Sequence, residues 1–174
     1  ETDILYEAND IALAHYHKIL ASSAGDKVRH YLKKRGVNET SLKTFSLGFA
    51  PESWNSLKDT LESNKIPHAA GVKAGLLIHN EKGNIYDRFR QRLIFPFYRL
   101  SGKIVGIGGR ALAKGQEPKY LNSPDSPIFS KGRELYGLYH SRDEIRKTGH
   151  AILVEGYLDV ISLFQAGFQN VVAG

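Results

Sequence analysis

The sequence has no cysteine and no methionine among its 174 residues. Without cysteine, the chain forms no disulfide and offers no thiolate ligand for zinc. A cysteine-free chain is compatible with the reducing cytoplasm. Because methionine is missing even at residue 1, we expect the chain to be part of a longer protein. No apolar run approaches the ~20 residues that a membrane-spanning helix needs, so we expect no membrane partner.

Excess positive charge is confined to the middle of the chain. Residues 1–81 hold 10 basic and 10 acidic residues, residues 82–147 hold 14 basic and 6 acidic, and residues 148–174 hold only 2 acidic residues. Such segregation favours a basic face for a polyanion, with a small acidic site beside it. The alternative is a chance cluster of charge on a solvated surface.

Helical periodicity dominates the first 75 residues. Apolar residues recur at three- and four-residue spacing from Asp3 to Leu20, which is typical of an amphipathic helix. We expect further helices at 26–36, 38–48, 53–63 and 69–75. Asn38 and Ser53 are the predicted N-caps, and Gly36 is the predicted C-terminal cap.

β-rich segments follow, separated by turn sequences such as NEKGN and LSGK. We expect strands within 76–79, 84–89, 92–98 and 103–112. They form a mostly antiparallel sheet in which Pro96 marks an edge or an irregularity. Ser141 and Glu144 have the spacing of a capping box for a helix that ends at Gly149.

The last segment reads as strand, helix and strand. AILVE and FQNVVAG are aliphatic runs typical of a parallel sheet covered on both faces, and GYLDVISLFQAG is long enough for the crossover helix. Two parallel strands do not make a domain, so we expect the rest of it to lie outside this chain. The predicted fold is therefore an α+β region, residues 1–147, followed by a truncated α/β βαβ unit, residues 148–174.

Two carboxylates lie at the predicted functional edge of this unit. Glu155 follows the first strand, where ligands of open α/β sheets bind, and Gly156 allows a tight turn into the helix. Asp159 lies in the first helical turns. Two such side chains and a helix N-terminus suit Mg²⁺, with further ligands required from elsewhere. Alternatively, Glu155 is a helix-start residue favoured by the macrodipole, which contributes ~0.3–1 kcal/mol.

The basic middle contains several candidate phosphate contacts. Arg88, Arg90 and Arg92 alternate, so in an extended segment they would share one face. Further candidates are Arg110 after a glycine pair, Tyr120 and Asn122 on one face opposite Lys119, and Lys131 beside a glycine. Lysine and arginine neutralise phosphates, and tyrosine stacks on bases. The alternative is that Arg88 or Arg92 pairs with Asp87 or another acid as surface decoration.

Together these motifs identify a resemblance. YDRFRQRLIFPF, GIGGRAL, PKYLNSPDSPIFSKGRELYGLY and ILVEGYLDVI occur in an order and spacing that closely resemble the catalytic core of bacterial DnaG-type replicative primases. YLKKRGVNE and LGFAPESWNSL in the first half also match. The resemblance extends from about residue 10 to the last residue.

The resemblance implies an RNA polymerase core, with a basic N-terminal subdomain at 1–147 and the start of a TOPRIM domain at 148–174. Such a protein synthesises RNA primers on single-stranded DNA from ribonucleoside triphosphates in the bacterial cytoplasm at the replication fork. Its cofactor is Mg²⁺, or Mn²⁺, completed by later acidic residues. The resemblance places zinc in a separate N-terminal domain and contact with the replicative helicase in a separate C-terminal domain.

The resemblance also assigns residues. Glu155 and Asp159 correspond to metal ligands, and Lys131 joins them as a catalytic residue. The implied contacts to template or nucleotide are Arg35, Trp54, Arg88, Arg90, Arg110, Lys119, Tyr120, Asn122 and Tyr157. Two other functions stay open at this point: another TOPRIM enzyme, such as a topoisomerase or nuclease, and a non-catalytic module that binds single-stranded DNA. We expect this chain alone to be inactive in primer synthesis.

Overall fold

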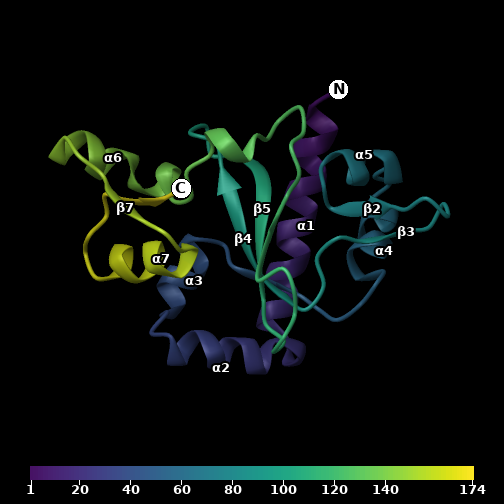
Figure 1. The fold of residues 1–174 in the computed structure, drawn as a ribbon, viewed down its shortest axis with the longest axis horizontal. Helices are drawn as coiled ribbons and strands as arrows, with labels where there is room; N and C mark the ends of the chain where they lie inside the picture. The colour runs from purple at the N-terminus through teal and green to yellow at the C-terminus, as the bar shows by residue number, and fades with distance from the viewer.

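The computed structural model describes residues 1–174, which form a central antiparallel sheet with a helical group on each side (Figure 1). The helices are α1 (Asp3–Ala21), α2 (Asp26–Lys34), α3 (Glu39–Thr44), α4 (Ser56–Ser63), α5 (His68–Lys73), α6 (Leu138–Thr148) and α7 (Tyr157–Gln165), with short 3-10 turns η1 (Ser23–Gly25) and η2 (Lys131–Arg133). The strands are β1 (Gly48–Ala50), β2 (Leu77–His79), β3 (Ile85–Asp87), β4 (Arg92–Tyr98), β5 (Ile104–Ala111), β6 (Tyr120–Asn122), β7 (Ile152–Val154) and β8 (Val171–Ala173).

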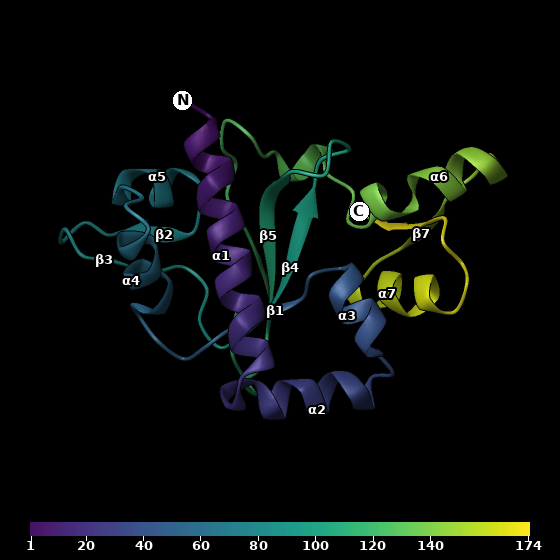
Figure 2. The same cartoon turned by 180° about the vertical axis from the view of Figure 1, so that it is seen from behind.

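The central sheet has the strand order β1-β4-β5-β6, and all its pairs are antiparallel. The long helix α1 packs against β1 and β5. The hairpin β2–β3, with α4 and α5, lies on one side of the sheet, whereas α6, β7 and α7 lie on the other (Figures 1 and 2). The sheet therefore lies between two smaller groups of elements.

The C-terminal unit is a parallel βαβ arrangement that is tied to the preceding chain. β7 pairs with β8 in parallel, and α7 connects them. Tyr136 forms a bridge with Ala173, and the buried Ser141 hydroxyl donates to the carbonyl of Val171 at 2.7 Å. α6 thus packs against β8. A division of the chain at residues 147/148 stays a prediction.

Successive side chains of β4 point to opposite faces of the sheet and pack into two different hydrophobic cores. Leu93, Phe95 and Phe97 enter a core that also contains Tyr157 and residues of α2, α7 and β8. The intervening Ile94 enters the second core, with residues of α1, α4 and α5. Because the first core includes the βαβ unit, that unit is anchored to the sheet by burial of apolar surface.

The predicted fold class is confirmed: an α+β region with an antiparallel sheet precedes a small parallel βαβ unit. Asn38 is the N-cap of α3, since its side chain accepts from the backbone N–H of Ser41 at 2.8 Å. Gly149 ends α6 in a left-handed conformation, as expected. Pro96 lies beyond the residues of β4 that pair with β1, next to a register shift at Phe97/Tyr98.

Four local expectations are wrong. The helix predicted at 38–48 ends at Thr44, and Gly48 already belongs to β1. Helix α4 begins at Ser56, not after Ser53, although the Ser53 hydroxyl accepts from the Ser56 N–H at 3.1 Å.

The predicted capping box is the third error, because Ser141 lies inside α6 and bonds to β8 instead of starting the helix. The fourth concerns β7, which is not covered on both faces in this chain, since Leu153 is 70% exposed.

Glycines in β5 let bulky side chains lie directly against the backbone of the sheet. A Cβ atom at Gly106 would lie 2.6 Å from the ring of Phe129. At Gly108 it would lie 2.7 Å from the Tyr157 ring and 3.0 Å from Asn122 Oδ1. Only glycine permits this approach, which brings α7 and β6 together over β5.

We predict that Gly108→Ala lowers the free energy of unfolding by about 1–3 kcal/mol, because the added methyl group overpacks the contact between Tyr157 and Asn122. Denaturant unfolding measures the change. Gly132→Ala is the matched control, since a Cβ there meets no atom within 4 Å. Equal stability of the two variants would contradict the close packing at Gly108.

Candidate functional site

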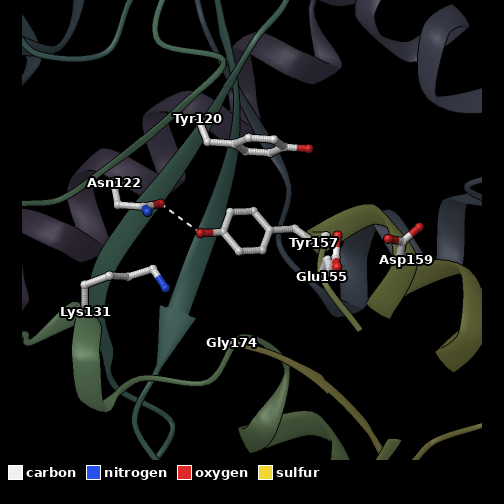
Figure 3. Close-up of a pocket in the computed structure, with 8 residues that line it drawn as sticks. Tyr120, Asn122, Lys131, Glu155, Tyr157, Asp159 and Gly174 are labelled. Atoms are coloured by element: carbon white, nitrogen blue, oxygen red, sulfur yellow. Dashed lines mark hydrogen bonds between the residues drawn. The ribbon is translucent and has the colours of Figure 1, made fainter. Parts of the chain in front are cut away.

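A pocket of about 420 Å³ opens where β7 ends and α7 begins. Tyr120 and Asn122 reach it from β6, and Lys131 reaches it from η2. Figure 3 shows these side chains on one side and the α7 end on the other. The lining residues are Tyr120, Asn122, Lys131, Glu155, Gly156, Tyr157, Asp159 and Gly174. Six of them are residues that the sequence analysis selected.

Tyr157 and Asn122 form the polar contact between the two sides of the pocket. The Tyr157 hydroxyl donates to Asn122 Oδ1 at 2.8 Å, and Tyr157 itself is 6% exposed (Figure 3). Burial raises the pKa of Tyr157 to about 12, against the opposing effect of its bond to Asn122. The tyrosine therefore keeps its proton at neutral pH. Since Oδ1 of Asn122 is engaged, its amide N–H groups remain available as donors.

Tyr120 contributes an aromatic ring to the pocket, and Lys131 contributes a positive charge. The Tyr120 ring is 43% exposed and meets the Tyr157 ring edge-on, with the centroids 5.8 Å apart. Lys131 forms no ion pair, and its Nζ lies 5.6 Å from the ring centroid of Phe97. An unpaired ammonium beside an exposed aromatic ring and amide donors suits an anionic, ring-bearing ligand.

Glu155 and Asp159 line the opposite side of the pocket, and both are exposed. Glu155 directly follows β7, and Asp159 lies in the first turn of α7. The chain has no group of three or more histidine, aspartate or glutamate side chains that could hold a metal ion. Two carboxylates have the hard oxygen atoms that Mg²⁺ prefers, so they fit part of its coordination sphere.

A second candidate surface surrounds Trp54, which is 58% exposed. The Arg90 guanidinium carbon lies 4.0 Å from the centroid of the Trp54 ring, and the Tyr86 ring meets the indole edge-on at 5.1 Å. We call Trp54, Tyr86 and Arg90 the tryptophan cluster. A pocket of about 510 Å³ adjoins it, with Arg88 and Gln91 in its lining. Its exposed π surface and positive charge suit a single-stranded nucleic acid.

The expected alternation of Arg88, Arg90 and Arg92 on one strand face is wrong. β3 ends at Asp87, and Gln91 has a positive φ of 52°, so the segment is not extended. Arg92 is buried, and its Nη1 donates to the Gly109 carbonyl at 3.2 Å.

Arg88 is partly buried, and its Nη2 donates to the carbonyl of Asn122 at 2.9 Å. Neither Arg88 nor Arg92 pairs with an acid, which also excludes the surface-decoration alternative for them. A direct contact of Arg88 with nucleic acid stays a prediction.

Arg35 and Arg110 gather around a third aromatic residue, Tyr31. Their guanidinium carbons lie 5.8 Å and 5.6 Å from its ring centroid, and Arg35 Nη1 also donates to its hydroxyl at 2.9 Å. Lys119 has an exposed side chain, while its carbonyl accepts from the Ala111 N–H at 2.8 Å. The predicted basic residues are therefore divided between separate surfaces.

Two aromatic partners, Tyr31 and Tyr86, were not predicted from the sequence. Tyr31 lies four residues before Arg35 in a helical segment, a spacing that places two side chains on the same face. That spacing was the available clue. Tyr86 gave no comparable clue, because its contact with Trp54 joins distant segments.

Comparison with known proteins agrees with these features. Residues 15–142 match the family described as "DNA primase catalytic core, N-terminal domain". The DNA primase of Halalkalibacterium halodurans is 42% identical over 175 residues, which cover 99% of this chain and 29% of that protein. This chain thus spans less than a third of that relative. No helix in the structure has both the length and the apolar character that crossing a membrane requires.

Two solved structures share the whole arrangement. The RNA polymerase domain of Mycobacterium tuberculosis primase DnaG, in complex with a double-stranded DNA oligomer with a 6-nucleotide overhang, has a TM-score of 0.94 and 32% identity, over 100% of this chain and 55% of that one. The DnaG primase catalytic domain bound to single-stranded DNA has a TM-score of 0.90 and 38% identity, over 98% of this chain and 55% of that one. The chain belongs to the DnaG primase family, as part of its catalytic RNA polymerase core.

Proposed function

We propose that this chain is the template- and nucleotide-binding part of a DNA-directed RNA polymerase that makes primers on single-stranded DNA. The observation that carries the proposal is the pocket between β6, η2 and the β7–α7 turn. It combines Glu155 and Asp159 with Lys131, Asn122 and Tyr120. Acidic oxygens on one side and a free ammonium on the other suit a nucleoside triphosphate with a divalent cation.

Each side chain has a proposed task in nucleotidyl transfer. Lys131 neutralises triphosphate charge, Asn122 donates from its amide, and Tyr120 offers an exposed ring for stacking. Tyr157 holds Asn122 in this orientation through its hydroxyl. Glu155 and Asp159 would hold Mg²⁺ or Mn²⁺, which lowers the pKa of the attacking hydroxyl and stabilises phosphate charge. Alternatively, Glu155 accepts the proton of that hydroxyl as a general base.

The proposed path of the template uses the other two basic surfaces. Trp54 and Arg90 offer a stacking platform with a positive charge, while Arg35 and Arg110 carry paired guanidiniums around Tyr31. Lys119 and Arg88 extend the positive charge near β6. Support comes from a relative of the same fold that is described as bound to single-stranded DNA.

We propose that other primase functions belong to parts of the protein outside residues 1–174. Further acidic ligands would complete the metal site, because two carboxylates are too few. Zinc binding and helicase contact would belong to separate domains. We further propose a functional boundary at residues 147/148, and no primer synthesis by residues 1–174 alone. Membership of the primase family disfavours a topoisomerase or nuclease, whereas a purely DNA-binding module remains a rival that experiment can exclude.

Binding of single-stranded DNA to this chain should weaken with salt, by a slope of about −0.7 in log K against log salt for each neutralised phosphate. Arg90→Ala should reduce the size of that slope by about 0.7 if Arg90 meets one phosphate. Fluorescence anisotropy of a labelled oligonucleotide measures both values. Lys147→Ala, with the same charge change on α6, is the control. Equal salt slopes for Arg90→Ala and Lys147→Ala would show that Arg90 does not contact a template phosphate.

Glu155→Gln distinguishes the enzyme from the binding module. In a primase that contains this segment, the change should reduce primer synthesis by about 10²-fold or more, because a metal ligand or base is neutralised. Binding of single-stranded DNA should persist, since Glu155 contributes no positive charge. Radiolabelled primer synthesis and oligonucleotide anisotropy are the two measurements. Unchanged synthesis would favour a non-catalytic role for this segment.

A further inference from the structure

Asp87 is a buried carboxylate that caps a helix distant from it in sequence. It ends β3 and is 1% exposed. Its Oδ2 accepts from the Leu57 N–H at 2.8 Å, and its Oδ1 accepts from the Lys58 N–H at 2.9 Å. These N–H groups lie in the first turn of α4, where the N-cap residue Asn55 offers no side-chain bond. Asp87 therefore satisfies donors that would otherwise lack partners.

The main chain of Asp87 holds the two central members of the tryptophan cluster. Its N–H donates to the carbonyl of Trp54 at 2.7 Å, and its carbonyl accepts from Arg90 Nη1 at 2.5 Å. The Asp87 side chain fixes the start of α4, two residues after Trp54. Asp87 thus bonds to the Trp54 backbone, to the Arg90 side chain and to the first turn of α4.

We propose that Asp87 is a positioning residue, whose buried carboxylate holds Trp54 and Arg90 in the geometry that contacts single-stranded nucleic acid. The inference rests on the proposed function, because it requires the tryptophan cluster to bind the template. Asp87 itself touches no ligand, since it is buried. Its effect on binding passes through the backbone of α4 and through the position of the Arg90 guanidinium.

The contact is also sensitive to pH. Burial raises the pKa of Asp87 to about 6, with Asp59 of α4 adding to the rise, while the Leu57 and Lys58 N–H groups and Arg90 oppose it. Tyr16 of α1 also faces Asp87, but burial raises the pKa of Tyr16 well above 10, so it is neutral. Asp87 is therefore ionised above about pH 6 and gains a proton below it.

Protonation should loosen the cluster without unfolding the chain. A carboxylic acid has one good acceptor oxygen in place of two, so one of the α4 N–H groups loses its partner. Arg90 also loses the attraction of a nearby negative charge. Because the folded pKa lies above the unfolded value of 3.8, this group favours the folded state more as pH falls from about 6 to 3.8. The expected change is thus local.

Trp54 reports on this change directly, because it is the only tryptophan in the chain. Its fluorescence in the unmodified chain should shift with a midpoint near the Asp87 pKa of about 6. Asp87→Asn should abolish the transition. His68 lines a pocket beside Trp54, and His15 contacts Ser56 of α4, so His68→Gln and His15→Gln are the controls that should retain it. A transition lost in either histidine variant but kept in Asp87→Asn would overturn the proposal.

Binding of a labelled single-stranded oligonucleotide tests the link to function. At pH above the transition, Asp87→Asn should weaken binding about fivefold, the effect of losing one charged hydrogen-bond partner. Asp59→Asn, with the same charge change on the exposed side of α4, should not weaken it. In a background that carries both Trp54→Ala and Arg90→Ala, Asp87→Asn should have no further effect, because both groups that it positions are gone.

The outcomes separate the two proposals. If Trp54→Ala leaves affinity unchanged, the proposed template path is wrong at this surface. If Trp54→Ala weakens binding but Asp87→Asn does not, only the positioning role of Asp87 fails. Should Asp87→Asn not fold, NMR of the unmodified chain decides the matter, with the Asp87 carboxyl and the Trp54 indole N–H followed together over pH. An indole signal that stays constant while the Asp87 carboxyl titrates would overturn the proposal.

Discussion

The bond between the Tyr157 hydroxyl and Asn122 holds the two sides of the candidate pocket together. It is possible only because Gly108 lets the tyrosine ring lie against the backbone of β5. Tyr157 belongs to the core that joins the sheet to α7 and β8, so a polar contact and an apolar core anchor the same residue. The acidic turn after β7 and Lys131 line opposite sides of the same pocket.

A second buried polar side chain, Asp87, holds the first turn of α4 on the other side of the sheet. Both anchors are buried side chains that bond to distant segments: Asp87 accepts from the Leu57 N–H, and Tyr157 donates to Asn122. They differ in charge: Tyr157 stays neutral at physiological pH, whereas Asp87 ionises near pH 6. The pocket between β6 and α7 is consequently insensitive to Tyr157 titration near neutral pH, whereas the tryptophan cluster contacts a group that titrates close to neutrality.

Features encoded by local periodicity could be predicted from the sequence. The helical pattern of residues 3–20, the βαβ unit and the position of Glu155 after its first strand all agree with the structure. Tyr120 and Asn122 do line one pocket, because alternation holds along the short strand β6. These successes follow from neighbours in sequence that share one element.

Features that depend on distant partners could not be predicted in this way. Ser141 has the spacing of a cap but bonds to Val171, and α4 is capped by Asp87 from another strand. The three alternating arginines fail for a similar reason, since Arg88 and Arg92 bond to carbonyl groups of β6 and β5. Tertiary hydrogen bonds override the local pattern in each case.

The dependence of the pocket on its central bond can be measured with a double-mutant cycle. Tyr157→Phe and Asn122→Ala are combined, and the free energy of unfolding is measured for the unmodified chain, both single variants and the double variant. A coupling energy of about 1 kcal/mol is expected, because each single change breaks the same hydrogen bond. Strictly additive effects of the two changes would contradict the claim that this bond joins β6 to α7.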